Sequence, residues 1–133
     1  MLKAQTTIKI DHAVLRVSDI SAARSFYGEL FNYCDWETVP DPGDERSIGF
    51  RSNAGFTLWL DEVSELNIGS SYGWLDHFAL HCESREAVNL AFDFCQSKGW
   101  EIITEPKAYP DYGNFYGFSF KGPDGIKLEF VTR

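Results

Sequence analysis

Two stretches in which apolar and polar residues alternate mark the start of two similar halves of the chain. Residues 8–17 alternate with a period of two, which predicts a strand with one apolar face. The apolar residues of 19–31 instead recur at helical spacing, and Ser18 or Asp19 offers a cap for the first turn. The pattern therefore predicts a strand followed by an amphipathic helix.

The same order begins again near residue 75. Residues 75–82 alternate, Ser84 is a suitable helix cap, and a helical apolar stripe runs through 87–95. The pair Lys98-Gly99 then ends the helix, because a cation suits the last turn and glycine suits the position after it. We predict a second strand and a second helix in this region.

The rest of each half consists of shorter apolar runs separated by turn-forming residues, which are typical of further strands. Each half is then expected to run strand–helix–strand–strand–strand. The expected strands are 47–52, 55–61, 100–104, 115–121 and 126–132, with turns at 40–44 and 122–125, a polar linker at 62–73 and a loop at 105–114.

The two halves also match in sequence. Ile10–Leu15 aligns with Leu75–Leu80 at a spacing of 65 residues, and three of the six positions are identical. Because this match coincides with the repeated order of elements, it indicates an internal repeat. We predict a single domain, 1–133, that consists of two modules at about 7–66 and 72–133.

Composition and charge narrow the class of partner. The 133 residues are 44% hydrophobic and 16% aromatic, which is typical of a globular chain. A net charge of −8 argues against nucleic acid and anionic membrane surfaces as partners, because both require clustered Lys and Arg. No apolar run is long enough to span a membrane and no signal peptide is evident, so we expect a cytoplasmic protein.

Cysteine chemistry is not indicated. The chain has Cys34, Cys82 and Cys95, an odd number with no two in a CxxC spacing. This pattern predicts neither a disulfide framework nor a zinc knuckle.

Three residues that suit a metal ion share one predicted face. Strand alternation directs His12, His77 and Glu129 away from the helices. A single histidine on a strand is usually a structural or solvent-facing residue, but here two of the three histidines occupy equivalent positions of the repeat. Two imidazoles and one carboxylate are a ligand set for a divalent cation, with positions left open for water or substrate.

Four segments resemble the vicinal oxygen chelate superfamily, which is the glyoxalase, bleomycin-resistance and extradiol-dioxygenase group. They are 11–19, 22–31, 75–80 and the segment 122–130, which ends near Glu129. The resemblance implies an α+β fold in which two βαβββ modules form a curved eight-stranded sheet around a cavity, with the helices on the outer face. It also implies a homodimer and one divalent metal ion, Fe²⁺, Mn²⁺, Zn²⁺ or Ni²⁺, held by His12, His77 and Glu129.

One position departs from the pattern of glyoxalase I. Members of that family carry a fourth protein ligand on the last strand of the first module, and the repeat aligns Trp59 with Glu129 at this position. An indole nitrogen only donates hydrogen bonds and does not bind metal. The set of two histidines and one carboxylate is closer to that of the extradiol dioxygenases.

Further side chains are expected to line the cavity. Arg16 and His81 each lie four residues beyond a candidate ligand, on the same strand face. Arg16 suits a carboxylate or enolate oxygen, and His81 suits general acid–base chemistry. Pairing of Arg16 with a neighbouring acid and of His81 with a backbone carbonyl explains them equally well. The expected pocket residues are Arg16, Trp59, Trp74 and Tyr116, with Tyr109 and Tyr112 near its mouth.

The resemblance implies a metal-dependent enzyme that acts on a small substrate with two chelating oxygens. Lyase or isomerase chemistry, ring-opening dioxygenation and epoxide opening, as in fosfomycin resistance, all remain open. The last is disfavoured because a phosphonate needs several cations and only Arg16, Lys127 and Arg51 are candidates. The alternative is a non-catalytic protein of the bleomycin-resistance type that sequesters a drug or another small molecule, which suits the negative net charge.

Overall fold

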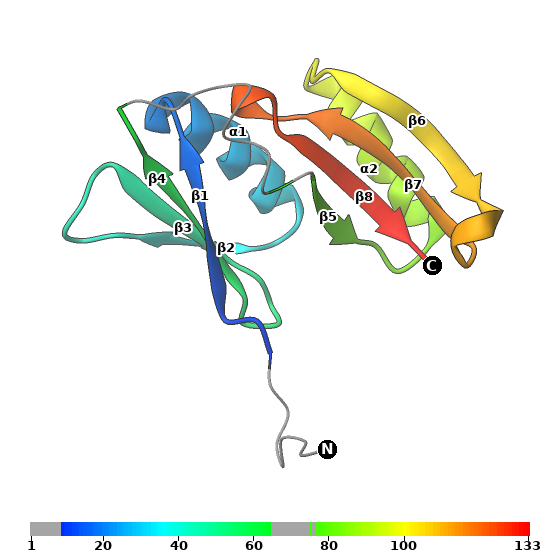
Figure 1. Cartoon of the computed structure of the whole chain (residues 1–133), viewed down its shortest axis with the longest axis horizontal. Coiled ribbons are helices and arrows are strands. Elements are labelled where there is room, and N and C mark those ends of the chain that lie inside the picture. Colours follow the sequence, from blue (N-terminus) through cyan, green and yellow to red (C-terminus); the bar gives the residue numbers. More distant parts are fainter. Residues whose placement is uncertain (1–8, 65–74, 76) are drawn as a thin grey trace, which may run out of the picture. The chain divides into compact units, whose positions relative to one another are not determined.

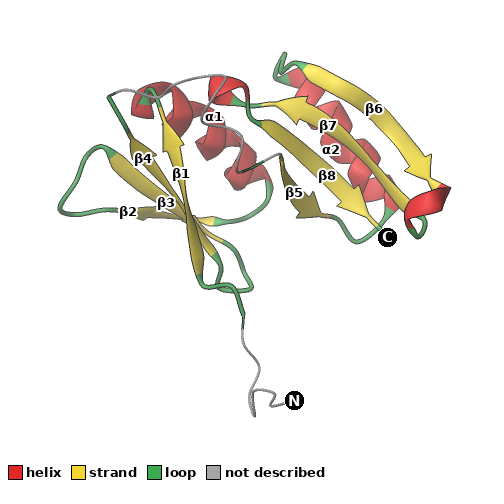
Figure 2. Ribbon diagram, viewed as in Figure 1, coloured by secondary structure: helices red, strands yellow, loops and turns green. Residues whose placement is uncertain are grey.

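Each half of the chain folds into a four-stranded sheet with one helix packed on one of its faces (Figures 1 and 2). This architecture is that of a computed structural model, which describes residues 9–64, 75 and 77–133. The chain divides into two compact units between Leu66 and Asn67, which we call the first and second modules.

The first module contains β1 (His12–Val17), α1 (Ile20–Tyr33), β2 (Glu37–Pro40), β3 (Ser47–Arg51) and β4 (Thr57–Glu62). Its sheet has the order β1-β4-β3-β2. β1 is parallel to β4, whereas the other pairs are antiparallel. β1 therefore forms one edge of the sheet beside the last strand of its module.

The second module repeats this arrangement. It contains β5 (His77–His81), α2 (Arg85–Ser97), β6 (Ile102–Tyr109), β7 (Phe115–Lys121) and β8 (Lys127–Thr132), with short 3₁₀ turns η2 (Pro110–Tyr112) and η3 (Pro123–Gly125). The sheet order is β5-β8-β7-β6, and β5 is parallel to β8. The predicted repeat is thus a repeat of topology as well as of sequence.

The first helix begins at one of the two predicted caps. The Asp19 carboxylate accepts hydrogen bonds from the backbone N–H groups of Ser21 and Ala22, at 2.9 and 3.1 Å. Glu62, at the end of β4, accepts a third from the N–H of Ile20 at 2.9 Å. These bonds satisfy N–H groups that have no partner within the helix, and they tie its first turn to the sheet.

The second helix also has the predicted ends. Ser84 Oγ accepts a hydrogen bond from the N–H of Ala87 at 3.1 Å. Lys98 caps the other end, and Gly99 follows with a φ of 72°, in the left-handed region that glycine adopts without strain.

An apolar core fills the space between helix and sheet in each module. The alternation predicted from the sequence is confirmed, since Leu58, Leu60, Leu128 and Phe130 are all buried. The helices contribute buried residues at helical spacing, among them Tyr27, Leu30 and Phe31 from α1 and Val88, Ala91 and Cys95 from α2. One face of each sheet is thereby covered, and the opposite face carries the candidate functional residues.

Two details differ from the sequence prediction. β6 continues to Tyr109 where the pattern predicts a loop, and β2 is a strand that the pattern does not delimit. Pro106 lacks an N–H group, but β6 is an edge strand and its pairing with β7 shifts between Thr104 and Lys107. An edge position and an irregular register are where a sheet tolerates proline.

The α+β class and the two βαβββ modules are confirmed. The hydrogen bonds of the described strands form two sheets of four strands, and neither sheet closes into a barrel. No helix in the described part of the chain is long and apolar enough to cross a membrane.

Candidate functional site

His77 and Glu129 meet on the uncovered face of the second sheet. The parallel register pairs His77 with Lys127 and Ala79 with Glu129, so all four side chains lie on the same face. His77 Nε2 is 3.4 Å from Glu129 Oε1. The His77 side chain is 41% exposed and that of Glu129 is 15% exposed, so the carboxylate sits low in the site and the imidazole lies nearer its rim.

Lys127 occupies the other side of the same carboxylate. Its Nζ lies 3.6 Å from Glu129 Oε2, and the lysine side chain is 38% exposed. Glu129 is therefore flanked by an imidazole at one oxygen and an ammonium group at the other. From the sequence, Lys127 is predicted only as a candidate phosphonate contact, although alternation along β8 places it on the same face as Glu129.

A pocket of about 470 Å³ opens on this face of the second module. Its polar residues are His77, Lys127, Glu129 and Arg133, and its aromatic residues are Tyr109, Tyr112 and Phe115. Phe115 and Arg133 are absent from the sequence prediction. Strand alternation continued from Glu129 through residue 131 would have placed Arg133 on the pocket face.

Three of these aromatic side chains gather where β6, η2 and β7 meet. The ring centroids of Tyr109 and Phe115 are 5.4 Å apart, and those of Tyr109 and Tyr112 are 6.5 Å apart. The Arg133 guanidinium lies 5.4 Å from the centroid of Phe115, and its Nη1 donates to the carbonyl of Tyr112 at 3.4 Å. This end of the pocket combines apolar ring surface with a positive charge.

His12 has the corresponding position in the first module. It opens β1 and pairs with Thr57 of β4, just as His77 opens β5 and pairs with Lys127 of β8. Its Nδ1 lies 2.8 Å from the Asp11 carboxylate, which can only accept, so Nδ1 carries the proton of this hydrogen bond. Nε2 is then the nitrogen that a cation would take, as in the carboxylate–histidine–metal arrangement.

Trp59 lies on the uncovered face of the first sheet. It pairs with Val14 and with Gly49, and a Cβ atom at Gly49 would stand 2.9 Å from the indole ring. The register gives Trp59 the same position relative to His12 that Glu129 has relative to His77. The strand pairing therefore agrees with the repeat alignment, in which Trp59 corresponds to Glu129.

Arg16 also lies on the uncovered face of the first sheet. The parallel register pairs it with Asp61, whose Oδ1 accepts a hydrogen bond from Ser47 Oγ at 2.6 Å. An acid thus lies beside Arg16, which fits the alternative that Arg16 pairs with a neighbouring acid and does not bind substrate. His81 ends β5 on the same face as His77, and it is exposed and does not line the pocket.

Tyr116 is not brought together with the other pocket residues of the second module. Its hydroxyl donates to Asn89 Oδ1 on α2 at 2.6 Å, and Arg85 of α2 lies 4.8 Å from its ring centroid. These contacts put Tyr116 on the helix side of β7, opposite to the face that carries Glu129. Tyr116 is therefore not among the residues that line the pocket, whereas Tyr109 and Tyr112, which the sequence predicts near its mouth, do line it. Trp74 lies outside the described residues.

The chemistry of the donor set fits a divalent cation in part. Two ligands about 2.1 Å from one ion lie about 3.0–3.4 Å apart at angles of 90–110°, and the separation between His77 and Glu129 matches this range. The residues that the structure describes form no group of three or more His, Cys, Asp or Glu side chains that could hold a metal ion.

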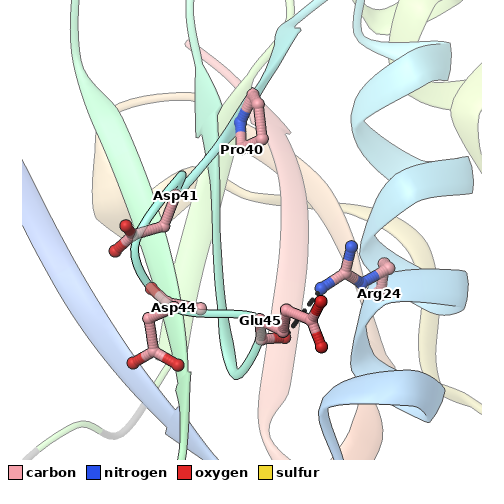
Figure 3. A pocket seen from close by; sticks show the side chains of 6 residues that line it. Arg24, Pro40, Asp41, Asp44 and Glu45 are labelled. Atoms are coloured by element: carbon pink, nitrogen blue, oxygen red, sulfur yellow. Dashed lines mark hydrogen bonds between the residues drawn. The ribbon is translucent and has the colours of Figure 1, made fainter.

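A second pocket, of about 410 Å³, lies beside the turn that leads into β3 in the first module (Figure 3). Its acids hold the turn together. Asp41 accepts a hydrogen bond from the N–H of Gly43, and Asp44 accepts one from the N–H of Arg46, both at 2.9 Å. Arg24 of α1 donates to the Glu45 carbonyl at 3.1 Å. These contacts explain the pocket as part of the loop structure.

One cysteine has altered chemistry. Partial burial raises the pKa of the Cys82 thiol, because desolvation disfavours the thiolate. Its backbone N–H donates to the carbonyl of Val131 at 2.7 Å, which continues the pairing of β5 with β8. Cys82 is therefore a structural residue next to the candidate acid–base residue His81.

Solved structures with this fold include several glyoxalase-like proteins. A possible glyoxalase from Bacillus cereus is 26% identical, with a TM-score of 0.71, over 94% of this chain and 99% of that one. A glyoxalase/dioxygenase from Nostoc punctiforme is 20% identical, with a TM-score of 0.73, over 98% of both chains. The fosfomycin resistance protein FosX from Listeria monocytogenes is 19% identical, with a TM-score of 0.73, over 96% of this chain and 95% of that one.

Sequence comparison supports the same grouping. Lactoylglutathione lyase GLX1 of Arabidopsis thaliana is 28% identical over an alignment of 129 residues, and the match covers 92% of this chain and 43% of that protein. The chain thus spans less than half the length of this curated relative. The family model described as the Glyoxalase/Bleomycin resistance protein/Dioxygenase superfamily matches residues 9–130. The chain therefore belongs to the glyoxalase/bleomycin resistance protein/dioxygenase superfamily.

Proposed function

We propose that this protein is a metal-dependent enzyme in which His12, His77 and Glu129 hold one divalent cation, namely Fe²⁺, Mn²⁺, Zn²⁺ or Ni²⁺. The observation that carries the proposal is the 3.4 Å approach of His77 Nε2 to Glu129 Oε1. His12 is supported by its equivalent strand register and by the contact of its Nδ1 with Asp11. Glu129 is only 15% exposed, which suits a carboxylate whose charge a cation compensates.

A cation at this position would supply Lewis acidity toward two oxygens of a small substrate, and so stabilise a developing enolate or oxyanion. The side chains of the chain itself would position the substrate. The rings of Tyr109 and Phe115 offer an apolar surface beside the polar end, and Lys127 adds a positive charge at Glu129. His81 is the proposed proton carrier and Arg16 the proposed contact for an anionic oxygen.

The reaction proposed is that of a lyase or isomerase, or an extradiol-type dioxygenation. The 28% identity to lactoylglutathione lyase GLX1 favours lyase chemistry in the broad sense. Trp59 argues against glyoxalase I activity itself, since it stands where the fourth ligand of that enzyme is expected and an indole does not bind metal. A set of two histidines and one carboxylate leaves more positions for a chelating substrate or for oxygen.

We also propose that the protein works as a homodimer. β1 and β5 are sheet edges, and Ile10 and Val14 are exposed at or beside the first of these edges. Exposed edges with apolar side chains are usually covered in native proteins, and a twofold pair of subunits is the simplest way to cover them. Light scattering at micromolar concentration should give twice the chain mass, and a monomer would contradict this proposal.

Metal analysis tests the function most directly. Protein purified without a histidine tag should bind one divalent ion per chain, measured by mass spectrometry and by calorimetric titration. His77→Ala and Glu129→Gln should each lower the affinity at least tenfold. Glu101→Gln is the matched control, because Glu101 pairs with Lys121 and does not line the pocket. Wild-type affinity in Glu129→Gln would overturn the proposal.

The alternative is a sequestering protein of the bleomycin-resistance type, and one observation favours it. Lys127 lies 3.6 Å from Glu129 and compensates the charge of the carboxylate without any metal. A net charge of −8 also suits capture of a cationic compound. This alternative predicts stoichiometric binding of a small molecule by protein that takes up no metal.

A further inference from the structure

The pocket of the second module has two chemically different ends. His77, Lys127 and Glu129 form the polar end, and Tyr109, Phe115 and Arg133 form the other. Residues 129 and 133 are four positions apart along one strand direction, which corresponds to about 13 Å. A ligand that touches both ends is therefore elongated, and its two halves meet different chemistry.

The distal end offers ring surface at an angle. The planes of Tyr109 and Phe115 are inclined by 59°, and those of Tyr109 and Tyr112 by 64°. The strand register pairs Tyr109 with Phe115, so both rings rise from adjacent strands onto the same face. Inclined rings form a corner that can contact a flat apolar group on its face and on its edge at once.

Two cations lie beside the rings at this end although the chain as a whole is strongly acidic. Arg133 lies over the ring of Phe115, and Lys107 Nζ lies 5.0 Å from the ring centroid of Tyr109. The acid that lines the pocket is Glu129, at the opposite end and beside Lys127. The guanidinium of Arg133 has five N–H donors, and its hydrogen bond to Tyr112 uses one of them.

We propose that Tyr109, Phe115 and Arg133 form a subsite for an aromatic carboxylate, with the ring in the aromatic corner and the carboxylate at the guanidinium. Arginine presents a fork of donors that matches the two oxygens of a carboxylate. The other half of the ligand would reach a metal at His77 and Glu129, and this part of the inference rests on the function proposed above. Binding at the subsite itself requires no metal.

The test uses the full chain without added metal and three probes that separate the contribution of the ring from that of the charge. Naphthalene-2-carboxylate should bind, with chemical-shift changes centred on Tyr109, Phe115 and Arg133. Naphthalene-2-carboxamide keeps the ring but lacks the charge, and acetate keeps the charge but lacks the ring. We expect each of these to bind at least tenfold more weakly, because each retains one of the two contacts.

Two variants locate the site. Arg133→Gln should weaken binding of naphthalene-2-carboxylate about tenfold and leave the carboxamide unaffected. Lys121→Gln makes the same change of charge at a residue that pairs with Glu101 outside the pocket, and should leave both probes unaffected. Equal binding of acid and amide by the wild type, or wild-type affinity in Arg133→Gln, would overturn the proposal.

Metal titration of the same samples separates this inference from the proposed function. Aromatic carboxylate binding without metal uptake would sustain the subsite and overturn the metal-dependent function. Metal uptake without aromatic carboxylate binding would overturn the subsite and sustain the metal-dependent function.

Discussion

The indole of Trp59 lies directly against Gly49 on the uncovered face of the first sheet. A Cβ atom built on Gly49 would stand 2.9 Å from Cε3 of the ring, closer than side-chain atoms pack. The two residues are partners in the register of β3 and β4. Glycine at this position therefore lets the ring lie flat across the neighbouring strand, and the ring in turn covers backbone that has no side chain.

This contact predicts that Gly49→Ala destabilises the protein. The added methyl group must displace the indole, which we expect to cost about 1–3 kcal/mol of unfolding free energy. Gly28→Ala is the matched control, since Gly28 lies inside α1 with no atom within 4 Å of a built Cβ. That change should instead stabilise the helix by about 0.5–1 kcal/mol. Urea unfolding of the two variants measures both changes in unfolding free energy. Equal changes in Gly49→Ala and Gly28→Ala would show that the contact does not constrain Trp59.

The position of Trp59 also predicts how a fourth ligand can be introduced. Trp59→Glu places a carboxylate at the repeat equivalent of Glu129, and a further anionic donor should tighten Ni²⁺ or Zn²⁺ binding at least tenfold. Trp59→Gln is the control, because it has the same length as glutamate without the charge. Calorimetric titration compares the three proteins. Identical affinities in Trp59→Glu and Trp59→Gln would show that residue 59 does not face the ion.

Much of the fold follows from local patterns in the sequence. Asp19 and Ser84 are recognisable as helix caps because their side chains accept hydrogen bonds within the next few residues. The faces of β4 and β8 follow from the period of two. It determines that Leu58 faces the helix of its module and that Glu129 faces away from the helix of its own module. Such features depend on neighbours close in sequence, and for that reason they could be predicted.

The parts that could not be predicted depend on distant partners. β6 contains Pro106 and reads as a loop, but pairing with β7 draws it into the sheet with a shifted register. Tyr116 resembles its neighbours in sequence, yet its contact with Asn89 on α2 turns it away from the pocket. Propensity carries no information about these tertiary contacts.

The raised pKa of Cys82 predicts slow alkylation of its thiol. Burial disfavours the thiolate, so at any pH below the pKa a smaller fraction of the thiol is ionised than in an exposed cysteine. Peptide mapping after brief iodoacetamide treatment should show a pH–rate profile displaced to higher pH in the native protein than in urea. An unchanged profile would contradict the assignment.

The same shift determines the sign of a stability effect. As pH rises above about 8.5, the thiol of the unfolded chain ionises while that of the folded chain stays neutral. Ionisation favours the unfolded state, so Cys82 should contribute to a loss of stability at alkaline pH. Cys82→Ala should remove this contribution. The difference in unfolding free energy between the wild type and Cys82→Ala should therefore be larger at pH 7 than at pH 10.

The ion pair between Lys127 and Glu129 yields the prediction that best separates the two candidate functions. If Glu129 binds a cation, the nearby ammonium group repels that cation, and Lys127→Met should strengthen metal binding. Lys127 is more than one-third exposed, so solvent screens the repulsion strongly. We therefore expect a gain of about three- to tenfold, well below the value for a buried charge.

A sequestering pocket predicts the opposite outcome. There Lys127 is the counter-ion of Glu129, and Lys127→Met would leave a carboxylate that is 15% exposed without its ammonium partner. The variant should then lose about 0.5–1 kcal/mol of stability, because solvent screens this partly exposed pair, and still bind no metal. Lys121→Met, which removes an ammonium paired with Glu101, controls for the general loss of a surface charge. Metal titration and urea unfolding of both variants decide between the functions, because tighter metal binding in Lys127→Met alone requires a cation at Glu129.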